Sequence, residues 1–297
     1  MAATLSEWVD SAESRAYTIQ FQRIEQLLAG ISNVGSISAD VRARAMGVTP
    51  TEYAYHQAIF QARVRRAKSE LDGEVLDRVR TLWRGKTIVC FGDSITADRQ
   101  SWAEILAGAL GPHVNVCNQG RAGDTTADLI ARFQFSVAPQ KPDAVVVLVG
   151  TNDARRFSAD VDGASGYGPM AISDEQTRLN LIELDRLISC VSPRAGLWMA
   201  PPPGIDERIQ QHPSGRLAFS QWRAADLASK SQLVRDLFPA AFDASDAFAP
   251  SAEVGQFLLS DGLHPNLAGQ VSIARGALAL LDQPSFHRNG AVQERKP

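Results

Sequence analysis

Two short segments of the sequence contain side chains that could act as a serine nucleophile and its base. The segment FGDSIT contains Ser94, and the segment DGLHPN contains Asp261 and His264. A serine hydroxyl is a poor nucleophile at neutral pH and needs a base to take its proton. Histidine suits this task because its unperturbed pKa lies near 6.5. Asp261, three residues before His264, is close enough in a tight turn to accept the ring N–H and orient the imidazole.

Two further segments could stabilise the negative charge that attack on an ester carbonyl creates. NQGRAGDTT contains Gly123, and GTND contains Asn152. The backbone N–H groups of Ser94 and Gly123 and the side-chain amide of Asn152 could donate hydrogen bonds to this oxyanion. One such donor is worth about 10²–10³ in rate. Each segment alone is an ordinary turn sequence. Together, the four segments indicate a site for acyl chemistry.

These segments lie where the chain alternates between strands and helices. Strands are predicted at residues 87–91, 114–117, 144–149, 196–200 and 240–243, and helices at residues 101–110, 125–135, 174–191, 217–237 and 266–281. Apolar strands that alternate with helices indicate a parallel sheet covered on both faces. Three of the segments follow the first three strands, and the fourth precedes the last helix. Because ligands bind beyond the carboxyl ends of such strands, we expect all four segments at one edge of the sheet.

As a set, the segments resemble those of the SGNH hydrolases, the GDSL-type lipase/esterase superfamily. All four occur in the family's order between Lys86 and Leu281, and Ile95 stands where the family name has leucine. The resemblance implies an α/β fold, a flavodoxin-like three-layer α/β/α sandwich whose five-stranded parallel sheet has the order 2-1-3-4-5. It also implies the site residues: Ser94, Asp261 and His264 as the catalytic triad, and Ser94, Gly123 and Asn152 as the oxyanion hole, with Gly120 as a weaker alternative to Gly123.

Competing catalytic motifs are absent from the sequence. The nucleophile elbow GxSxG of the α/β-hydrolases has no match, since residues 163–167 lack its last glycine. No GxGxxG fingerprint follows the first strand. The remaining histidines are scattered without ligand spacing and are expected on the surface or in packing roles: His56, His113, His212 and His287. We therefore predict neither a catalytic metal nor a cofactor.

The sequence is predicted to divide into three parts: an α-helical N-terminal extension at residues 1–84, an SGNH hydrolase domain at residues 85–282 and a disordered tail at residues 283–297. Helical spacing in the extension predicts helices at residues 4–28, 39–46 and 51–82, with Gly73 as a weak point of the last.

The role of the extension has several interpretations. It could cover the following domain as a cap, form the contact of a homodimer or dock another protein. A homodimer is slightly favoured, because the extension has more apolar positions than an already covered sandwich can easily bury. Residues 38–66 also have the helix-turn-helix pattern of DNA-binding proteins, but neighbouring acidic residues offset their basic cluster.

Composition narrows the possible partners and location. The chain has 297 residues, 44% of them hydrophobic, and a formal net charge of −3, which gives no electrostatic case for nucleic acid. No segment approaches the roughly 18–20 consecutive apolar residues of a membrane span, and residues 1–15 lack the pattern of a signal peptide. We expect a cytoplasmic protein with neither nucleic-acid nor membrane partners.

Cys90, Cys117 and Cys190 lie in apolar stretches and are predicted to be buried, reduced thiols.

Two long loops at the carboxyl edge, residues 154–173 and 201–214, are expected to shape the substrate site. The first carries Arg155, Arg156 and Tyr167, which we predict to contact the substrate. One of the arginines could meet an anionic group, and the alternative is that both are solvated loop residues.

The sequence offers no long apolar channel for an acyl chain. We therefore predict a metal-independent serine esterase that hydrolyses a short acyl ester, above all an acetyl ester, of a small hydroxylated or carbohydrate-like molecule. A thioesterase or acyltransferase using the same site is one alternative. A docking protein on an inactive hydrolase fold is the other.

Overall fold

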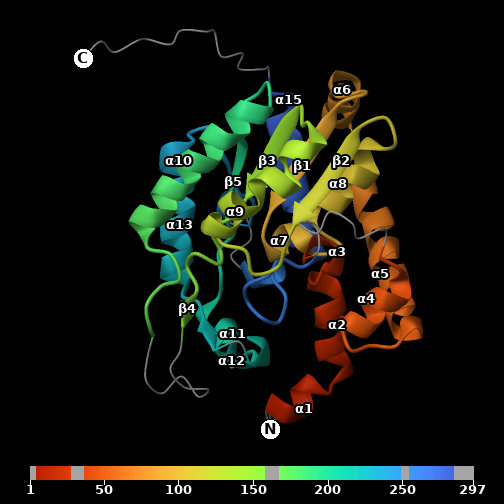
Figure 1. Ribbon diagram of the computed structural model, residues 1–297, viewed down its shortest axis with the longest axis vertical. Coiled ribbons are helices and arrows are strands. Elements are labelled where there is room, and N and C mark those ends of the chain that lie inside the picture. Colours follow the sequence, from red (N-terminus) through yellow and green to blue (C-terminus); the bar gives the residue numbers. More distant parts are fainter. Residues whose placement is uncertain are drawn as a thin grey trace.

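A five-stranded parallel sheet forms the centre of the α/β part of the chain (Figure 1). The computed structural model describes residues 5–27, 37–71, 73–157, 167–217, 219–248 and 254–283. The strands of the sheet are β1 (Thr87–Gly92), β2 (Asn115–Gly120), β3 (Ala144–Leu148), β5 (Leu197–Ala200) and β7 (Phe242–Asp243). They lie in the order β2-β1-β3-β5-β7, and each neighbouring pair is parallel. This is 2-1-3-4-5 in chain order, so the predicted sheet is confirmed.

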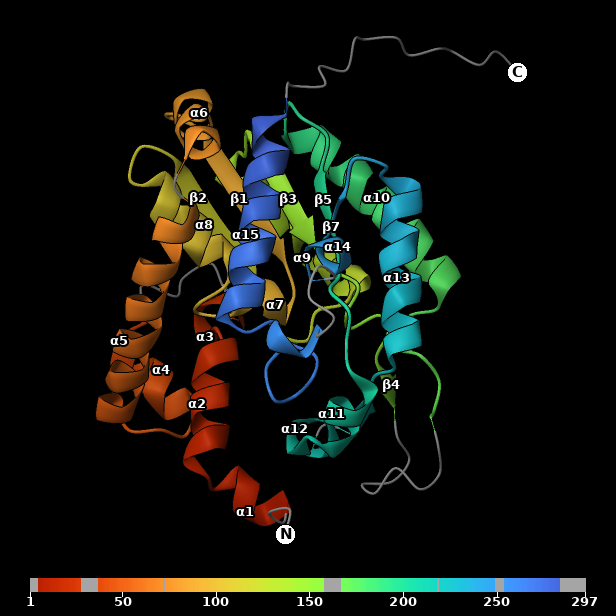
Figure 2. The same ribbon diagram turned by 180° about the vertical axis from the view of Figure 1, so that it is seen from behind.

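Helices cover both faces of the sheet, as a three-layer sandwich requires (Figures 1 and 2). One face carries α9 (Thr126–Ser136), α10 (Asp174–Val191) and α13 (Ala224–Leu237), and the other carries α8 (Trp102–Leu110) and α15 (Leu267–Asp282). Side chains of a strand alternate between the two faces. In β1, Val89 and Phe91 therefore belong to the first core, and Ile88 and Cys90 belong to the second. The three-layer architecture is confirmed.

Polar side chains fix where the covering helices begin. Ser101, Thr125, Ser173 and Asn266 precede α8, α9, α10 and α15, and each accepts a hydrogen bond from a backbone N–H of the first turn. At α9 the cap is a reciprocal capping box between Thr125 and Asp128. These starts lie at or next to the predicted ones.

The helix predicted at residues 217–237 is wrong at its N-terminal end. α13 begins at Ala224, and the residues before it form α11 (Asp206–Gln211), α12 (Pro213–Leu217) and the short strand β6 (Ser220–Gln221). β6 pairs antiparallel with β4 (Arg156–Phe157) from the loop after β3. Phe219 has a φ of +48°, which a right-handed helix cannot contain.

The N-terminal extension is helical, as predicted, but its helices are shorter. They are α1 (Leu5–Val9), α2 (Ala12–Phe21), α3 (Ile24–Leu27), α4 (Ala39–Ala45), α5 (Pro50–Ala67), the 3₁₀ turn η1 (Lys68–Leu71) and α6 (Glu74–Leu82). The predicted helix at residues 4–28 is interrupted because Ser11 starts a new helix by capping α2. The predicted helix at residues 51–82 is interrupted at Gly73, whose φ of +138° is open to glycine.

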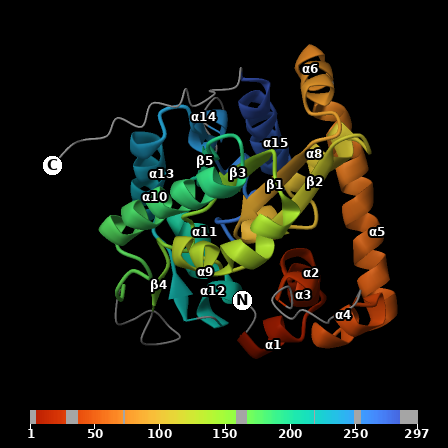
Figure 3. The ribbon, with the colours of Figure 1, turned by 45° about the horizontal axis from the view of Figure 1, so that its top comes forward.

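The second half of the extension packs on the sandwich itself. Leu76, Val79 and Trp83 are buried in the same core as Ile105 of α8 and Ile273 of α15. Figure 3 shows α5 along the flank outside α8. One chain therefore buries part of the apolar surface of the extension on the sandwich, while Val41, Tyr55, Val75 and Leu82 stay exposed. Homodimer formation stays a prediction.

The prediction of three buried thiols is wrong for two of them. All three cysteines are free, but only Cys90 is buried, while Cys117 is half-buried and Cys190 is exposed. Cys190 lies two residues after the buried Ile188 of α10. Two residues of an α-helix span about 200°, which turns Cys190 to the opposite side.

No helix in the described ranges has the length and apolar character to cross a bilayer. The predicted tail after Gln283 lies outside these ranges.

Candidate active site

Ser94, His264 and Asp261 form a continuous line of hydrogen bonds at the carboxyl edge of the sheet. Ser94 Oγ lies 2.8 Å from His264 Nε2, and His264 Nδ1 lies 2.6 Å from Asp261 Oδ2. Ser94 is the first residue of α7 (Ser94–Ala97), a short helix that directly follows β1. The Asp93 side chain caps this helix by accepting a hydrogen bond from the N–H of Ile95 at 3.0 Å. We call the line of Ser94, His264 and Asp261 the relay.

A tight turn orients Asp261 toward the imidazole. Asp261 Oδ1 accepts hydrogen bonds from the backbone N–H groups of Leu263 and His264, each at 2.9 Å. Gly262 gives the turn its shape with a φ of +68°, a conformation that L side chains rarely adopt. Because Oδ1 is held by the backbone, Oδ2 faces the ring nitrogen.

The charges of the relay shift two pKa values in opposite directions. Burial of His264 disfavours the imidazolium, but the Asp261 carboxylate outweighs it and raises the pKa of His264 above its usual value. Burial of Asp261 favours its neutral form, but the charge of His264 and three hydrogen bonds keep the pKa of Asp261 well below its usual range. Asp261 is therefore an anion wherever the protein is folded near neutral pH.

The loop after β2 and the loop after β3 meet beside Ser94. Gly123 has a φ of +86°, and the Asn152 side chain donates one amide hydrogen to the backbone oxygen of Asp124 at 3.0 Å. The second amide hydrogen of Asn152 is left for a ligand. Ser94 starts a helix, so its backbone N–H has no intrahelical acceptor. These groups line the same pocket as the relay.

Arg132 braces this arrangement, and the sequence analysis did not single it out. The buried guanidinium pairs with Asp124 and donates to the backbone oxygens of Gly92 and Gln119 at 3.0 and 2.9 Å. It therefore ties the ends of β1 and β2 to the residue that holds Asn152. An arginine in a predicted helix is normally expected on the surface, so the sequence contained no signal for the buried role of Arg132.

The pocket over the relay has a volume of about 210 Å³. Its floor contains Ser94, Gly123, Asn152 and His264. One wall comes from the predicted loop at residues 201–214 and the segment after it, with Ile209, His212, Ser214, Ser220 and Trp222. Further lining residues come from α2 and the residue after it: Tyr17, Phe21 and Gln22. Figures 1 and 2 show α2 and the α11–α12 pair on either side of the chain segment that precedes α15.

Tyr17 and His212 are two of the pocket residues that the predicted site did not include. Tyr17 reaches the relay from α2: its hydroxyl lies 3.1 Å from Asp261 Oδ2 and 3.2 Å from His264 Nδ1. His212, expected on the surface or in a packing role, is buried, contacts the rings of Trp8 and Tyr17, and lies 2.8 Å from Ser214 Oγ. An aromatic residue four positions before another aromatic residue in a helix has the same pattern as a core residue, so the sequence carried no signal for Tyr17.

The three predicted substrate contacts lie in different surroundings. Arg155 lines the pocket, with its guanidinium 5.2 Å from the ring centre of Phe157. Arg156 does not line it, because its guanidinium is paired with Asp226 at 2.6 Å. Tyr167 does not line it either: its hydroxyl accepts a hydrogen bond from Gln210, and Arg223 lies over its ring.

Two carboxyl groups beside the relay are fully buried. Burial raises the pKa of Asp93 to about 7 and that of Asp98 to about 6. The charges of both act on His264 and favour its imidazolium. Within the described ranges, no group of three or more His, Cys, Asp or Glu side chains is arranged to hold a metal ion.

Comparisons with known proteins find the same family in sequence and the same fold in structure. The model of the GDSL-like lipase/acylhydrolase family matches residues 90–271, more than half of the chain. An uncharacterized lipoprotein of Bacillus subtilis, YqeF, is 32% identical over 105 residues, which cover 32% of this chain and 40% of that protein. An arylesterase of Vibrio mimicus is 30% identical over 100 residues, which cover 31% of this chain and 46% of that protein. The matches thus span less than half the length of these two relatives.

A lipase/acylhydrolase from Enterococcus faecalis has a similar structure, with a TM-score of 0.52 and 24% sequence identity. The match covers 68% of this chain and 98% of that one. At this identity the similarity establishes the fold alone.

Proposed function

The chain belongs to the GDSL-like lipase/acylhydrolase family, and we propose that it is a serine esterase that hydrolyses short acyl esters. We propose acetyl esters of small hydroxylated or carbohydrate-like molecules as its substrates. The observation that carries this proposal is the relay, in which Ser94, His264 and Asp261 are joined at 2.8 and 2.6 Å beneath an open pocket.

The proposed reaction proceeds through an acyl-enzyme. Ser94 Oγ attacks the ester carbonyl carbon while His264 Nε2 takes the hydroxyl proton. The N–H groups of Ser94 and Gly123 and the amide of Asn152 donate to the oxyanion. The intermediate then collapses, and His264 gives its proton to the departing alcohol. Water attacks the acyl-enzyme by the same steps and releases the acid, while Asp261 stabilises the imidazolium throughout.

The size of the pocket favours a short acyl group. Its volume of about 210 Å³ lies below the roughly 300–1,000 Å³ of sites that enclose drug-sized ligands. Phe21, Ile209 and Trp222 limit the space around Ser94. A long acyl chain would have to leave the pocket and lie on the surface.

A chain-length series tests the proposed function. We expect purified protein to hydrolyse p-nitrophenyl acetate with a higher kcat/KM than the butyrate and octanoate esters. Acetyl thioesters and added alcohol acceptors are assayed in parallel. A preference for octanoate, for the thioester or for transfer to the alcohol would contradict the proposal of a short-chain esterase, and each would identify the reaction that replaces it.

The protonation of His264 predicts the pH dependence of catalysis. The imidazole must be neutral to accept the serine proton, and Asp261 raises its pKa above 6.5. We therefore expect kcat/KM to fall on acidification through an apparent pKa above 6.5, because the protonated fraction grows as pH decreases. Initial rates on p-nitrophenyl acetate from pH 5 to 9 measure it. A flat profile over this range would mean that another group takes the proton.

Arg155 predicts a preference for substrates with an anionic group. Its guanidinium lines the pocket and has no carboxylate partner among the described residues. We expect Arg155→Gln to lower kcat/KM for 4-acetoxybenzoate about tenfold and to change that for neutral phenyl acetate less than about twofold, since only the first ester carries a negative charge that can pair with the guanidinium. Arg178→Gln on the exposed face of α10 is the control. Equal losses on both esters would contradict this role.

A further inference from the structure

We propose that Tyr17 is a positioning residue of the relay, so that the N-terminal extension supplies part of the catalytic centre. The proposal deepens the proposed serine esterase function and rests on it. Tyr17 lies outside residues 90–271, the part of the chain that matches the family. Its hydroxyl lines the pocket and donates a hydrogen bond to Asp261 Oδ2 at 3.1 Å.

The hydroxyl of Tyr17 completes the hydrogen bonding of the Asp261 carboxylate. Oδ1 accepts the two backbone N–H groups of its own turn, and Oδ2 accepts His264 Nδ1 at 2.6 Å. Tyr17 is the fourth donor, at 3.1 Å, and the one donor of this set that comes from outside the turn. It therefore fixes the carboxylate relative to the rest of the site, which the turn's own N–H groups cannot do.

The same face of α2 also holds the imidazole ring. Phe21 lies four residues after Tyr17, so both side chains are on one face of the helix. The Phe21 ring centre lies 4.3 Å from that of His264, and the Tyr17 ring approaches His264 edge-on at 5.9 Å. One face of α2 therefore packs on the imidazole ring of His264 and donates a hydrogen bond to the carboxylate of Asp261.

Tyr17 keeps its proton near neutral pH. Burial and the neighbouring charge of Asp261 raise the pKa of Tyr17 well above its usual value. The hydroxyl therefore remains a neutral donor to Asp261 and does not compete with His264 for the serine proton.

A cluster of polar contacts fixes the end of α2 to the segment that follows α7. Arg99 donates from its backbone N–H to the carbonyl of Gln20 at 3.0 Å, and from its side chain to the carbonyls of Ile19 and Gln22 at 2.9 and 3.1 Å. These are the carbonyls at the C-terminal end of α2, which have no partner within the helix.

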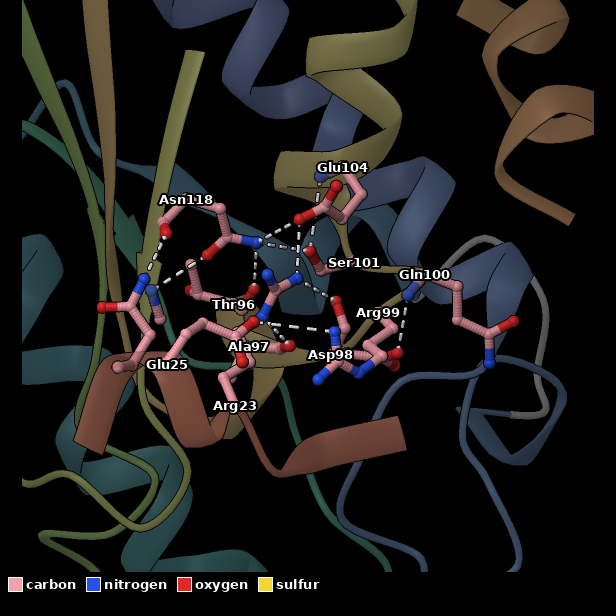
Figure 4. Close-up of polar contacts among 12 residues, drawn as sticks. Arg23, Glu25, Thr96, Ala97, Asp98, Arg99, Gln100, Ser101, Glu104 and Asn118 are labelled. Carbon is pink, nitrogen blue, oxygen red and sulfur yellow. Dashed lines mark hydrogen bonds and ion pairs between the residues drawn. The ribbon is translucent and has the colours of Figure 1, made fainter. Parts of the chain in front are cut away.

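Arg23 adds a second attachment to the same segment (Figure 4). Its guanidinium donates to the carbonyl of Ala97 and to Glu104, both at 2.6 Å, and Asn118 donates to the same Glu104 oxygen at 3.0 Å. Ala97 ends the helix that Ser94 begins. The helix of Tyr17 and the helix of the nucleophile are therefore held as one unit, and Tyr17 has a fixed position relative to the relay.

The variant Tyr17→Phe tests the hydroxyl while keeping the ring. We expect kcat on p-nitrophenyl acetate and the rate of Ser94 labelling by a fluorophosphonate to fall about tenfold, with KM changed less than about threefold, because a hydrogen bond to a charged group is lost. Without this donor the Asp261 carboxylate stabilises the imidazolium more strongly and raises the pKa of His264 further. The acid limb of the pH profile should therefore move to higher pH. The other groups that face His264 are Asp93, Asp98 and His212, and the variant leaves them unchanged.

Two comparisons distinguish positioning from simple stabilisation. Tyr53→Phe removes the hydroxyl of another buried tyrosine of the extension, in a cluster that does not include Tyr17, and we expect its kcat and pH profile to match the wild type. Replacing Tyr17 with 4-aminophenylalanine restores a donor at the same place and should recover kcat to within about threefold. Thermal unfolding of each variant shows whether it is folded.

The outcomes separate this inference from the proposed function. Wild-type protein that neither hydrolyses acyl esters nor reacts with the fluorophosphonate would overturn the proposed function. An active wild type with a folded Tyr17→Phe of equal kcat and unchanged acid limb would overturn the role of Tyr17 alone. Failure of 4-aminophenylalanine to recover kcat in a folded variant would also overturn it.

Discussion

Replacing Ser94 with alanine is expected to reduce ester hydrolysis at least about 10³-fold and to abolish covalent labelling by a fluorophosphonate probe. Ser94 Oγ lies 2.8 Å from His264 Nε2, so it is the hydroxyl whose proton His264 is placed to take. Removal of a triad nucleophile leaves only the catalysis supplied by the oxyanion hole and by binding. Initial rates on p-nitrophenyl acetate and mass spectrometry of the labelled protein measure the two effects.

The matched control for this variant is Ser69→Ala. Ser69 lies in the exposed η1 turn, where its hydroxyl bonds only to the backbone of Arg66 among the described contacts. We expect its rate and labelling to equal those of the wild type. Turnover by Ser94→Ala at the wild-type rate would contradict the acyl-enzyme mechanism.

Replacing Asp261 with asparagine is expected to reduce kcat about 10³–10⁴-fold with little change in the fold. The asparagine oxygen can still accept the backbone N–H groups of Leu263 and His264. Its NH₂ group then faces His264 Nδ1 and makes that nitrogen an acceptor, which puts the ring proton on Nε2. An Nε2 that carries a proton cannot take one from Ser94, so the tautomer of the imidazole is wrong for catalysis.

Steady-state kinetics and thermal unfolding together check this expectation. Asp236→Asn makes the same substitution on the exposed side of α13 and should leave kcat unchanged. Fluorophosphonate labelling of Asp261→Asn should slow in parallel with kcat, because both need the base. A folded Asp261→Asn that keeps more than about a tenth of the wild-type kcat would show that the carboxylate is not needed to orient His264.

The sheet and the four segments at its edge could be predicted because their signals are local. The central strands β1 and β3 are runs of apolar residues followed by Ser94 and Asn152, and Gly123 follows the edge strand β2. In a parallel sheet, residues that follow strands share one edge, so topology alone brings them together. Asp261 and His264 precede the last helix at the same edge, and their separation of three residues fixed their contact.

The wall of the pocket could not be predicted because it depends on how distant elements pack. Tyr17 and Phe21 have the spacing of core residues, and only the docking of α2 shows that they face His264. Arg156 follows Arg155 directly, yet its guanidinium turns to Asp226, 70 residues later. Adjacent residues in extended chain point to opposite sides, and which side faces the pocket is a property of the tertiary structure.

The hydrogen bond from Tyr17 to Asp261 joins residues 244 positions apart, and this separation orders the events of biosynthesis. Ribosomes synthesise the N-terminal end first. Helix α2, Ser94 and the Arg99 that binds the end of α2 therefore emerge well before His264. During that interval Phe21 and Tyr17 have no imidazole to pack on, and Ser94 has no base. A nascent or prematurely released chain that ends before residue 261 therefore leaves Tyr17 and Phe21 without these partners and lacks the base of the proposed mechanism. The proposed catalytic centre is complete only once residues 261–264 have also been synthesised.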